Sequence, residues 1–438
     1  MFGSGKSSRV FIKRLNQIRH IKETLQDIYR LIREAPVREN QLISLSRQNI
    51  DLRLQIKKIH HSKINVVFIL WRPQMWESLR SVYEAFNNDE NFCVYIVVVP
   101  IRDVESAESY SSTGAEEFWK QYSAINGYDY ETGKWFLLED LKPDYVFFQQ
   151  PYDGLHPVAY QSQTVGMYSK ICYVPYGMQV VGKDILDIVY PSAFLKYTSF
   201  LFCLDKYSVT SIARQLTEQG IATQVEICGS TRFDALKQYQ NTESDSWPHE
   251  HEGRFRILWT PRWSTNEGTC TFFENKASLL DWVHENKDVD LVFRPHPEMH
   301  REMISTGEFS EEEWNRMQVD FSSDPQLTME TLPEYFPTFF SSDCLVTDIT
   351  SLMVEYIMTG HPLIYCHKKN YFTKLGEYIS QGFYIVHNQQ ELIDTLQKIK
   401  DGYDPLKDTR RQIIESLRPH GTPAGENIKN VILADALK

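Results

Sequence analysis

Short apolar runs alternate with segments of helical periodicity along most of this chain, and this alternation limits the fold more than any other feature. Such runs are typical of strands buried on both faces of a parallel sheet, and the intervening patterns predict covering helices. The sequence therefore predicts an α/β protein. We expect strands at 64–70, 92–99, 145–148, 171–174, 199–204, 225–228, 256–260, 291–294, 344–347 and 362–366, and helices at 74–86, 208–219, 278–285, 351–359 and 390–400.

A polar segment divides the strands into two series. Residues 241–253 read NTESDSWPHEHEG, which lacks apolar periodicity and predicts a linker or hinge. At 438 residues the chain is too long for one ordinary core. We therefore expect two Rossmann-like domains facing a cleft, with ligands at the carboxyl ends of the strands. The expected parts are a helical arm over 1–62, a first domain over 63–240, the linker, a second domain over 254–404 and a C-terminal helical segment over 405–438.

The N-terminal arm is basic and has a helical pattern. Residues 1–63 contain 14 Lys and Arg against 5 Asp and Glu, although the whole chain has a net charge of −12. The arm includes a heptad seam with one polar position, made of Leu42, Leu45, Asn49, Leu52, Ile56 and Ile59. Three uses of this seam stay open: packing on the protein's own body, pairing with a second copy as a homo-oligomer, or docking to an anionic membrane or polymer. The basic charge slightly favours docking.

Composition excludes several other classes of protein. With 42% hydrophobic and 24% charged residues, the chain is globular rather than disordered. No apolar stretch reaches the roughly 18 residues of a membrane span and no secretory signal pattern occurs, so we expect a cytoplasmic protein, peripheral on the inner face of the membrane if the arm docks there. The acidic body disfavours nucleic acid as a partner. The seven cysteines lack metal spacing and are expected to be reduced, and no cofactor is expected.

The most informative stretch, residues 341–366, reads SSDCLVTDITSLMVEYIMTGHPLIYC. It predicts a buried strand, a hydroxyl cap at Thr350 or Ser351, and a helix that ends at Gly360. Hydroxyls and free backbone N–H groups at such a helix start suit a phosphate, and Glu355, one turn further on, is placed to reach a ribose hydroxyl. An ordinary capped βαβ unit without a ligand has the same pattern, so spacing alone leaves both interpretations open.

Four motifs together resemble the CDP-glycerol glycerophosphotransferase family, which includes teichoic-acid primases and polymerases. They are 229–234 (GSTRFD), 258–263 (LWTPRW), 294–297 (RPHP) and 342–351 (SDCLVTDITS), and the likeness extends over roughly 145–387. The resemblance implies a GT-B fold and a CDP-activated donor bound by the second domain. It also implies transfer of a glycerol-phosphate or related polyol-phosphate unit to a hydroxyl of a cell-surface glycan or lipid-linked acceptor.

Strand-end position and the resemblance together select the donor-site candidates. By resemblance, His296 would contact the donor diphosphate, where a stiffly held imidazole could stabilise charge on the leaving nucleotide as an acid or an electrostatic clamp. A guanidinium also suits a diphosphate, although a surface salt bridge explains Arg262 equally well. A metal site at His296 and His300 is rejected, because Pro297 interrupts their helical spacing and no third ligand is evident. The donor-binding candidates are Arg262, Arg294, His296, Thr347, Asp348, Thr350, Ser351 and Glu355.

The acceptor side departs from the family. Where the family has a His-Gly pair whose histidine is thought of as the general base, this chain has Tyr176-Gly177, and a phenol with a pKa of about 10 is rarely ionised at neutral pH. The preceding strand end carries Asp153 and His156 in a stiff loop of Gly and Pro residues. We predict that one of them is the base, although a structural turn explains the loop nearly as well.

Two further groups have alternative explanations. Arg232 and Asp234 follow the last strand of the first domain near the expected cleft, where Arg232 either faces the acceptor or pairs with Asp234. The linker histidines His249 and His251 have no companion cysteines and predict no metal site.

The leading hypothesis is therefore a CDP-glycerol glycerophosphotransferase-like enzyme. A GT-B glycosyltransferase that uses a nucleotide sugar is the nearest alternative, since the expected His-Gly pair is missing. A hydrolysing nucleotide-sugar epimerase is weaker, because it needs a cluster of catalytic carboxylates that the sequence does not reveal. An inactive assembly or scaffold protein is the alternative outside enzymes, and it need not bind a nucleotide at all.

Overall fold

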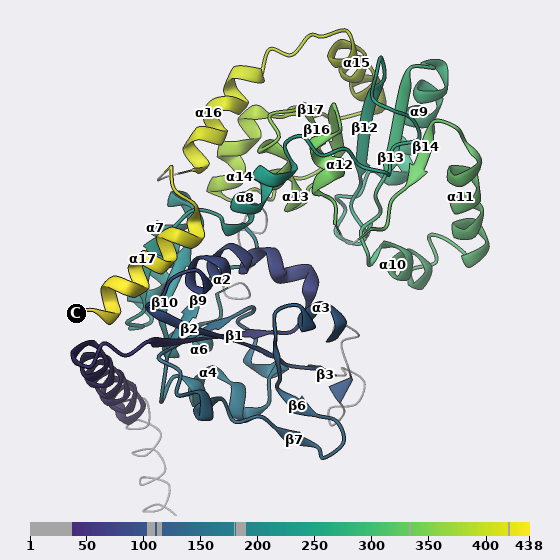
Figure 1. Ribbon diagram of the computed structural model, residues 1–438. Coiled ribbons are helices and arrows are strands. Elements are labelled where there is room, and N and C mark those ends of the chain that lie inside the picture. Colours follow the sequence, from purple (N-terminus) through teal and green to yellow (C-terminus); the bar gives the residue numbers. More distant parts are fainter. Residues whose placement is uncertain are drawn as a thin grey trace, which may run out of the picture.

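The computed structural model describes residues 37–438 except 103–109, 112–115, 179, 181–189, 333 and 419–420. Two sheets form two bodies, each with helices on its faces (Figure 1). All neighbouring strands of both sheets run parallel. The predicted α/β class with two Rossmann-like sheets is confirmed. Residues 1–36, which include the first predicted half of the arm, lie outside the described residues.

The first domain is built on a seven-stranded sheet of order β11-β10-β9-β8-β1-β2-β5. The chain begins in the middle at β1, moves outward through β2 and β5, and then returns to the other side of β1 with β8. This reversal is the switch point of a doubly wound sheet. Its strands are β1 (Ile64–Leu70), β2 (Phe92–Val98), β5 (Ile125–Asn126), β8 (Tyr145–Phe148), β9 (Lys170–Tyr173), β10 (Thr198–Cys203) and β11 (Gln224–Ile227).

The second domain repeats this plan with six strands in the order β14-β13-β12-β15-β16-β17. Numbered within the domain, the order is 3-2-1-4-5-6, which is the dinucleotide-binding arrangement, and the switch point lies between β12 and β15. The strands are β12 (Phe255–Thr260), β13 (Val289–Phe293), β14 (Leu327–Met329), β15 (Cys344–Thr347), β16 (Leu363–Cys366) and β17 (Tyr384–Val386).

Helices fill the connections between these strands. In the first domain they are α2 (Arg80–Asn87), α3 (Glu116–Lys120), α4 (Ser162–Val165), α6 (Ser192–Tyr197), α7 (Lys206–Glu218) and α8 (Thr231–Leu236), with 3₁₀ turns η1 (Pro73–Ser78), η2 (Leu138–Leu141), η3 (Asp153–Leu155), η4 (Val158–Tyr160) and η5 (Lys237–Tyr239). The short pairs β3 (Ile101–Arg102) with β4 (Tyr110–Ser111) and β6 (Tyr128–Asp129) with β7 (Lys134–Trp135) are antiparallel.

The remaining helices belong to the second half of the chain. They are α9 (Phe272–Glu285), α10 (Met299–Ser305), α11 (Glu311–Ser323), α12 (Phe336–Phe340), α13 (Leu352–Ile357), α14 (Lys374–Ile379), η6 (Ser380–Gly382), α15 (Gln389–Lys400), α16 (Lys407–Leu417) and α17 (Ala424–Ala436).

Each predicted strand is present, with small displacements of its ends. The helix expected over 74–86 is instead divided into η1 and α2, because Leu79 between them has a non-helical φ of −125°. Three short and only partly buried strands of the two sheets were not predicted: β5, with two residues, and β14 and β17, with three residues each. Six of the seven cysteines are buried and all are free thiols, as expected for core residues.

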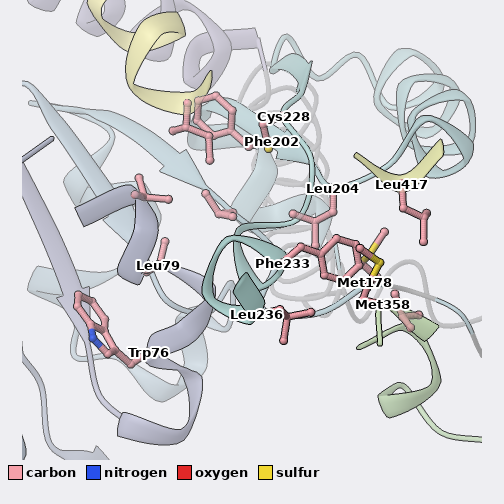
Figure 2. Packing of buried hydrophobic residues seen from close by; sticks show 14 of the residues in the cluster. Trp76, Leu79, Met178, Phe202, Leu204, Cys228, Phe233, Leu236, Met358 and Leu417 are labelled. Carbon is pink, nitrogen blue, oxygen red and sulfur yellow. The ribbon is translucent and has the colours of Figure 1, made fainter. Parts of the chain in front are cut away.

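Side chains from both domains share one hydrophobic cluster. Figure 2 shows Met178 and Phe233 of the first domain beside Met358 and Leu417, which follow α13 and end α16. The backbone of Thr373 also donates to the carbonyl of Val180 at 3.0 Å, across the domain boundary. These contacts hold the two sheets at a fixed separation on this side of the cleft.

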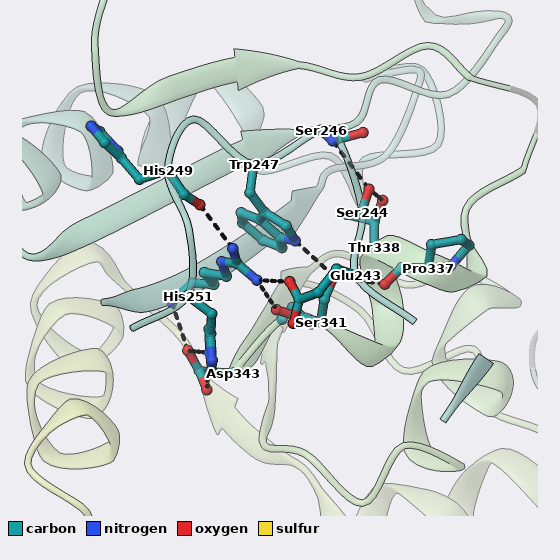
Figure 3. A network of polar contacts seen from close by, with 12 residues as sticks. Glu243, Ser244, Ser246, Trp247, His249, His251, Pro337, Thr338, Ser341 and Asp343 are labelled. Carbon is teal, nitrogen blue, oxygen red and sulfur yellow. Dashed lines mark hydrogen bonds and ion pairs between the residues drawn. The ribbon is translucent and has the colours of Figure 1, made fainter. Parts of the chain in front are cut away.

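The polar segment 241–253 is anchored along the second domain rather than hanging free (Figure 3). The buried guanidinium of Arg256 donates to the carbonyl of His249 at 2.8 Å and pairs with the carboxylate of Glu243 at 2.5 Å. Trp247 is buried and donates through Nε1 to the Ser341 hydroxyl at 2.8 Å. The sequence indicated a linker because the segment is polar, but its polar groups are used to attach it to β12 and α12.

The C-terminal segment returns to the first domain. Helix α17 lies along α2 and α8 (Figure 1), and its first two N–H groups, of Ala424 and Gly425, donate to the carboxylate of Asp234 at 2.9 and 3.0 Å. Asp234 therefore caps α17 and does not pair with Arg232. Gly425 is required here, because a Cβ at this position would lie 2.3 Å from the Ser81 carbonyl oxygen.

The described part of the arm is a helix over 37–59 that packs on the first domain through Ile43, Ile50 and Leu54. Figure 1 shows it beside the C-terminal end of α17, where the Lys58 ammonium bonds the Leu437 carbonyl at 2.5 Å. Within the described residues, no helix combines the length and apolar character that crossing a bilayer requires.

We expect Asp234→Ala to lower the free energy of unfolding by roughly 1–3 kcal/mol, since it leaves two partly buried N–H groups without an acceptor. Equilibrium urea unfolding measures this change. Asp408→Ala, which removes only an exposed i,i+3 ion pair on α16, is the matched control and should change stability by less than about 0.5 kcal/mol. Equal effects of the two substitutions would contradict the capping role.

Candidate active site at the domain cleft

At the switch point of the second sheet, two threonine side chains are hydrogen bonded to each other at the ends of β12 and β15. β12 ends at Thr260 and β15 ends at Thr347, which are directly paired in register. Their hydroxyl oxygens lie 2.8 Å apart, and the Thr347 hydroxyl also donates to the Thr260 carbonyl at 2.7 Å. The loops that follow the two strands therefore leave the sheet from one fixed point and diverge above it.

The next residue, Asp348, fixes the loop after β12. Its buried carboxylate accepts hydrogen bonds from the backbone N–H groups of Arg262 at 2.7 Å and Thr271 at 2.9 Å, and from the Thr271 hydroxyl. Burial raises the pKa of Asp348 to about 6, while these donors oppose the rise. Thr347 and Asp348 were predicted to bind the donor, but both are buried beneath the cavity and instead shape its walls.

A cavity of about 710 Å³ opens above this switch point. Its walls come from the loops after β12, β13 and β15, together with part of α11 and the segment before α12. Five of the predicted donor residues line it: Arg262, Arg294, His296, Thr350 and Ser351. Basic groups and hydroxyls thus face one concave space at the carboxyl ends of parallel strands, where a nucleotide phosphate is expected in this type of sheet.

His296 is oriented by its neighbours. Its Nδ1 accepts a hydrogen bond from the backbone N–H of Glu298 at 3.1 Å, and its ring lies against Trp263 with centroids 5.9 Å apart. In the neutral imidazole the proton therefore sits on Nε2, which is the atom left for a ligand. Burial, and then the charge of Arg262, lower the pKa of His296.

The two arginines of the cavity differ in how firmly they are held. Arg294 donates to the buried carboxylate of Glu330 and to the Leu332 carbonyl, both at 2.7 Å. Arg262 pairs only with the more exposed Glu267, at 2.7 Å. Exposed pairs are weak, so the Arg262 guanidinium can exchange this partner for a phosphate, whereas Arg294 contributes a fixed positive charge.

Of the two predicted capping residues, Thr350 makes a long bond and Ser351 makes none. The Thr350 hydroxyl accepts from the backbone N–H of Leu352 at 3.4 Å, whereas Ser351, directly before α13, has helical backbone angles and its side chain makes no capping bond. The helix has six residues, which gives it little dipole at its start. Thr350 and Ser351 therefore contribute their hydroxyls to the cavity rather than a helix-terminus site.

Glu355 was predicted to reach a ribose, but it is engaged across the domain boundary. Its Oε1 lies 2.6 Å from Nε of Arg232, and its Oε2 accepts from the hydroxyl of Tyr335. Arg232 also donates to Tyr335 and, at 3.2 Å, to the carbonyl of Tyr176. These residues join the first domain, through Arg232 and Tyr176, to the second domain, through Tyr335 and Glu355.

A second cavity of about 290 Å³ lies on the acceptor side of this bridge. Tyr176, Gly177 and Arg232 line it, as predicted for acceptor-side residues. It shares Tyr335, Ser351 and Leu352 with the larger cavity, so the two spaces meet at one wall. The Tyr176 hydroxyl is hydrogen bonded to that of Tyr152 at 2.9 Å.

The structure disfavours both predicted bases. His156 is buried, burial lowers its pKa to about 4, and its Nε2 lies 3.3 Å from the amide nitrogen of Gln150. The Asp153 carboxylate accepts from the backbone N–H of Ser162 at 2.7 Å and from the same residue's hydroxyl. Neither side chain lines the two cavities, and this position favours the alternative explanation of a structural turn.

Sequence reasoning missed Tyr335, which belongs to both cavities and to the domain bridge. It lies in the segment between β14 and α12, and β14 was not predicted from the sequence, so the strand-end rule did not select it. Among the described residues, no group of three or more His, Cys, Asp or Glu side chains has the arrangement of a metal site. His300, rejected as a ligand, pairs with Glu311 at 3.0 Å.

Comparison with known proteins agrees with the motifs. The family described as CDP-Glycerol:Poly(glycerophosphate) glycerophosphotransferase matches residues 210–420, which include the second sheet and the larger cavity. The resemblance predicted from the sequence is confirmed over this range, in which the chain is similar to a CDP-glycerol glycerophosphotransferase. No curated relative matches the chain in sequence.

Solved structures with the same fold are distant in sequence. A UDP co-structure of MnaA from S. aureus has 16% identity and a TM-score of 0.56, covering 84% of this chain and 96% of that one. A putative UDP-N-acetylglucosamine 2-epimerase from Listeria monocytogenes has 15% identity and a TM-score of 0.57, covering 85% and 96%. A soaked structure of the wall teichoic acid polymerase TagF has 14% identity and a TM-score of 0.49, covering 96% and 98%. The first two likenesses establish the predicted GT-B fold and nothing about activity.

We expect the Arg232–Glu355 pair to couple the domains energetically. A double-mutant cycle with Arg232→Gln and Glu355→Gln, followed by urea unfolding, should give a coupling energy of about 1–3 kcal/mol, because both side chains are largely buried. The exposed pair Arg316–Glu312 is the matched control and should couple by only about 0.3–0.5 kcal/mol. A coupling no larger than the control value would show that the bridge does not hold the domains.

Proposed function

We propose that this chain, which matches the CDP-glycerol:poly(glycerophosphate) glycerophosphotransferase family over residues 210–420, transfers a glycerol-phosphate or related polyol-phosphate unit from a CDP-activated donor to an acceptor hydroxyl. The observation that supports this most strongly is the cavity of about 710 Å³ at the switch point of the second sheet, inside the range that the family matches. We further propose that the acceptor is a cell-surface glycan or a lipid-linked precursor.

The donor diphosphate fits the charge of this cavity. Arg262 and Arg294 approach from the loops after β12 and β13, and the hydroxyls of Thr350 and Ser351 approach from the loop after β15. Guanidinium groups bind phosphate oxygens in paired hydrogen bonds, and hydroxyl groups donate hydrogen bonds to the remaining lone pairs of those oxygens. In this arrangement the nucleotide lies across the switch point, with its β-phosphate toward the wall shared with the smaller cavity.

The reaction requires charge stabilisation on the leaving group. The acceptor hydroxyl oxygen attacks the β-phosphorus, and the bond from that phosphorus to the bridging oxygen breaks with its electron pair on CMP. The hydroxyl proton passes to the released CMP phosphate or to solvent. His296 donates through Nε2 to a phosphate oxygen of the departing nucleotide, where negative charge increases during bond breaking. Arg294 adds a positive charge that Glu330 and Leu332 already hold in place.

The acceptor enters from the smaller cavity. Tyr176, Gly177 and Arg232 line it, and the wall containing Tyr335 and Ser351 separates it from the donor. An acceptor hydroxyl placed at this wall approaches the β-phosphorus from the side opposite the nucleotide, as an in-line displacement needs. The bridge from Arg232 to Glu355 fixes the width of this passage.

The first test is donor binding. His296→Ala and Ser351→Ala should each weaken CDP-glycerol binding, measured by calorimetry, by roughly 1–3 kcal/mol, because each removes a hydrogen bond to a charged group. His284→Ala and Ser305→Ala change the same residue types outside the cavity and should bind as the unchanged protein does. Unaltered affinity in both cavity variants would remove this site.

A panel of donors separates the alternatives. CMP release from CDP-glycerol, with incorporation of the polyol-phosphate into acceptor, supports the proposal. Turnover of a nucleotide sugar in its place would indicate a glycosyltransferase. A protein that binds none of these nucleotides would be a scaffold.

The pH dependence of binding tests the role of His296. Burial and Arg262 lower its pKa in the free protein, and an anionic diphosphate at Nε2 raises that pKa, so the protonated form binds more tightly. Affinity for CDP-glycerol should therefore rise as pH falls from 8 to 6, by up to about tenfold for each unit of pKa increase on binding. His296→Gln should flatten this dependence. If affinity changes with pH equally in the unchanged protein and in His296→Gln, His296 does not contact the diphosphate.

A further inference from the structure

The arm helix over 37–59 has two apolar faces, although packing on the body requires only one. Its inner face buries Ile43, Ile50 and Leu54 against the first domain. Its other face carries the hydrophobic residues of the heptad seam, which are 58–72% exposed: Leu42, Leu45, Leu52, Ile56 and Ile59. The seam is therefore not the surface that holds the helix to its own body.

The charged groups of this helix are used on the inner side. Arg47 donates to the carbonyls of Ala222 and Thr198 at 2.8 and 2.9 Å. Arg53 and Lys57 both reach the buried carboxylate of Asp144, at 3.2 and 2.5 Å. Asp51 pairs with Lys170 at 2.6 Å, and Glu39 pairs with Lys196.

The seam, in contrast, has one uncharged edge. This edge is formed by Gln41, Gln48 and Gln55, which recur at a spacing of seven and are exposed. Ser44 and Asn49 are also exposed on or near this face. An edge of this kind adds no positive charge that would attract anionic lipid, whereas two copies can approach each other along it without placing like charges together.

We propose that the seam pairs with the same seam of a second copy of this chain, as a parallel, in-register two-stranded coiled coil. In heptad positions, Leu42, Asn49 and Ile56 occupy a and Leu45, Leu52 and Ile59 occupy d. Asn49 then faces Asn49 of the partner, and a single polar pair at a specifies two strands and fixes the register. The pairing assigns the arm to assembly and revises the slight preference for membrane docking that its net charge suggested.

The size of the surface sets the expected affinity. A helix over 37–59 is about 35 Å long, and with a contact width of about 10 Å each copy covers on the order of 350 Å². The total of about 700 Å² is less than the roughly 1,000 Å² of a stable specific interface, so the dimer should be weak and concentration-dependent.

Sedimentation equilibrium on the full chain tests the pairing. At ~50 µM the mass should be about twice the 51.4 kDa of the chain, and at well below ~1 µM it should approach one chain. The double variant Leu45→Glu, Leu52→Glu should stay monomeric at every concentration, because it places charges inside the seam. Val319→Glu with Leu137→Glu, which alters two equally exposed residues elsewhere, should still dimerise.

Disulfide crosslinking tests the register. Asn49→Cys should yield a covalent dimer on mild oxidation, since facing a positions bring the two Cα atoms within reach of a disulfide. Ser44→Cys, exposed but outside a and d, should remain uncrosslinked under the same conditions.

Three results would overturn the proposal. A monomeric full chain at ~50 µM excludes the second copy. A monomeric full chain that dimerises once residues 1–36 are removed would show that this segment covers the seam. The third result concerns anionic phosphatidylserine vesicles. If the full chain sediments with them, the variant Leu45→Glu, Leu52→Glu does not, and the two proteins have the same mass in solution, then the seam binds a membrane.

Discussion

The buried carboxylate of Asp348 is the constraint on which the candidate site depends. It ties the loop after β15 to the loop after β12 through Arg262 and Thr271, directly above the threonine pair that closes the sheet. A carboxylate removed from water is stable only when hydrogen-bond donors contact its oxygens. Separating the two loops would therefore expose the Asp348 carboxylate to water or leave it without these donors. The cavity walls are consequently fixed before any ligand arrives, which is the condition for electrostatic stabilisation of a phosphate.

The position of the second domain relative to the first depends on contacts at both ends of the cleft. On one side α17 crosses back and is capped by Asp234, and on the other Arg232 reaches Glu355 and Tyr335. The larger and smaller cavities meet at Tyr335 and are therefore held at a constant distance by the same residues that join the domains. The motif 229–234 lies outside the larger cavity, but this arrangement gives two of its residues a role. Asp234 caps α17, and Arg232 joins the two sides of the cleft.

Sequence patterns predicted the sheets well because strand burial is a local property of apolar runs. Strand ends also selected Arg262, His296 and Ser351, which line one cavity because parallel strands place their carboxyl ends along one edge. The patterns did not show which polar residue near a strand end faces inward, so Asp348 was assigned to the donor and His156 to the acceptor although both are buried. The partner of Glu355 could not be predicted either, because Arg232 lies far away in the sequence and meets it only after both domains have folded.

The central claim is that the donor nucleotide binds at the switch point between β12 and β15, and a crystal structure after a soak with CDP-glycerol tests it most directly. The account predicts density for the diphosphate within hydrogen-bonding distance of Arg262, His296 Nε2 and the hydroxyls of Thr350 or Ser351, with the β-phosphate toward Tyr335. Nucleotide bound instead in the separate cavity beside His367 and His387, at the ends of β16 and β17, would contradict it. A switch-point cavity that stays empty at saturating CDP-glycerol would contradict it equally.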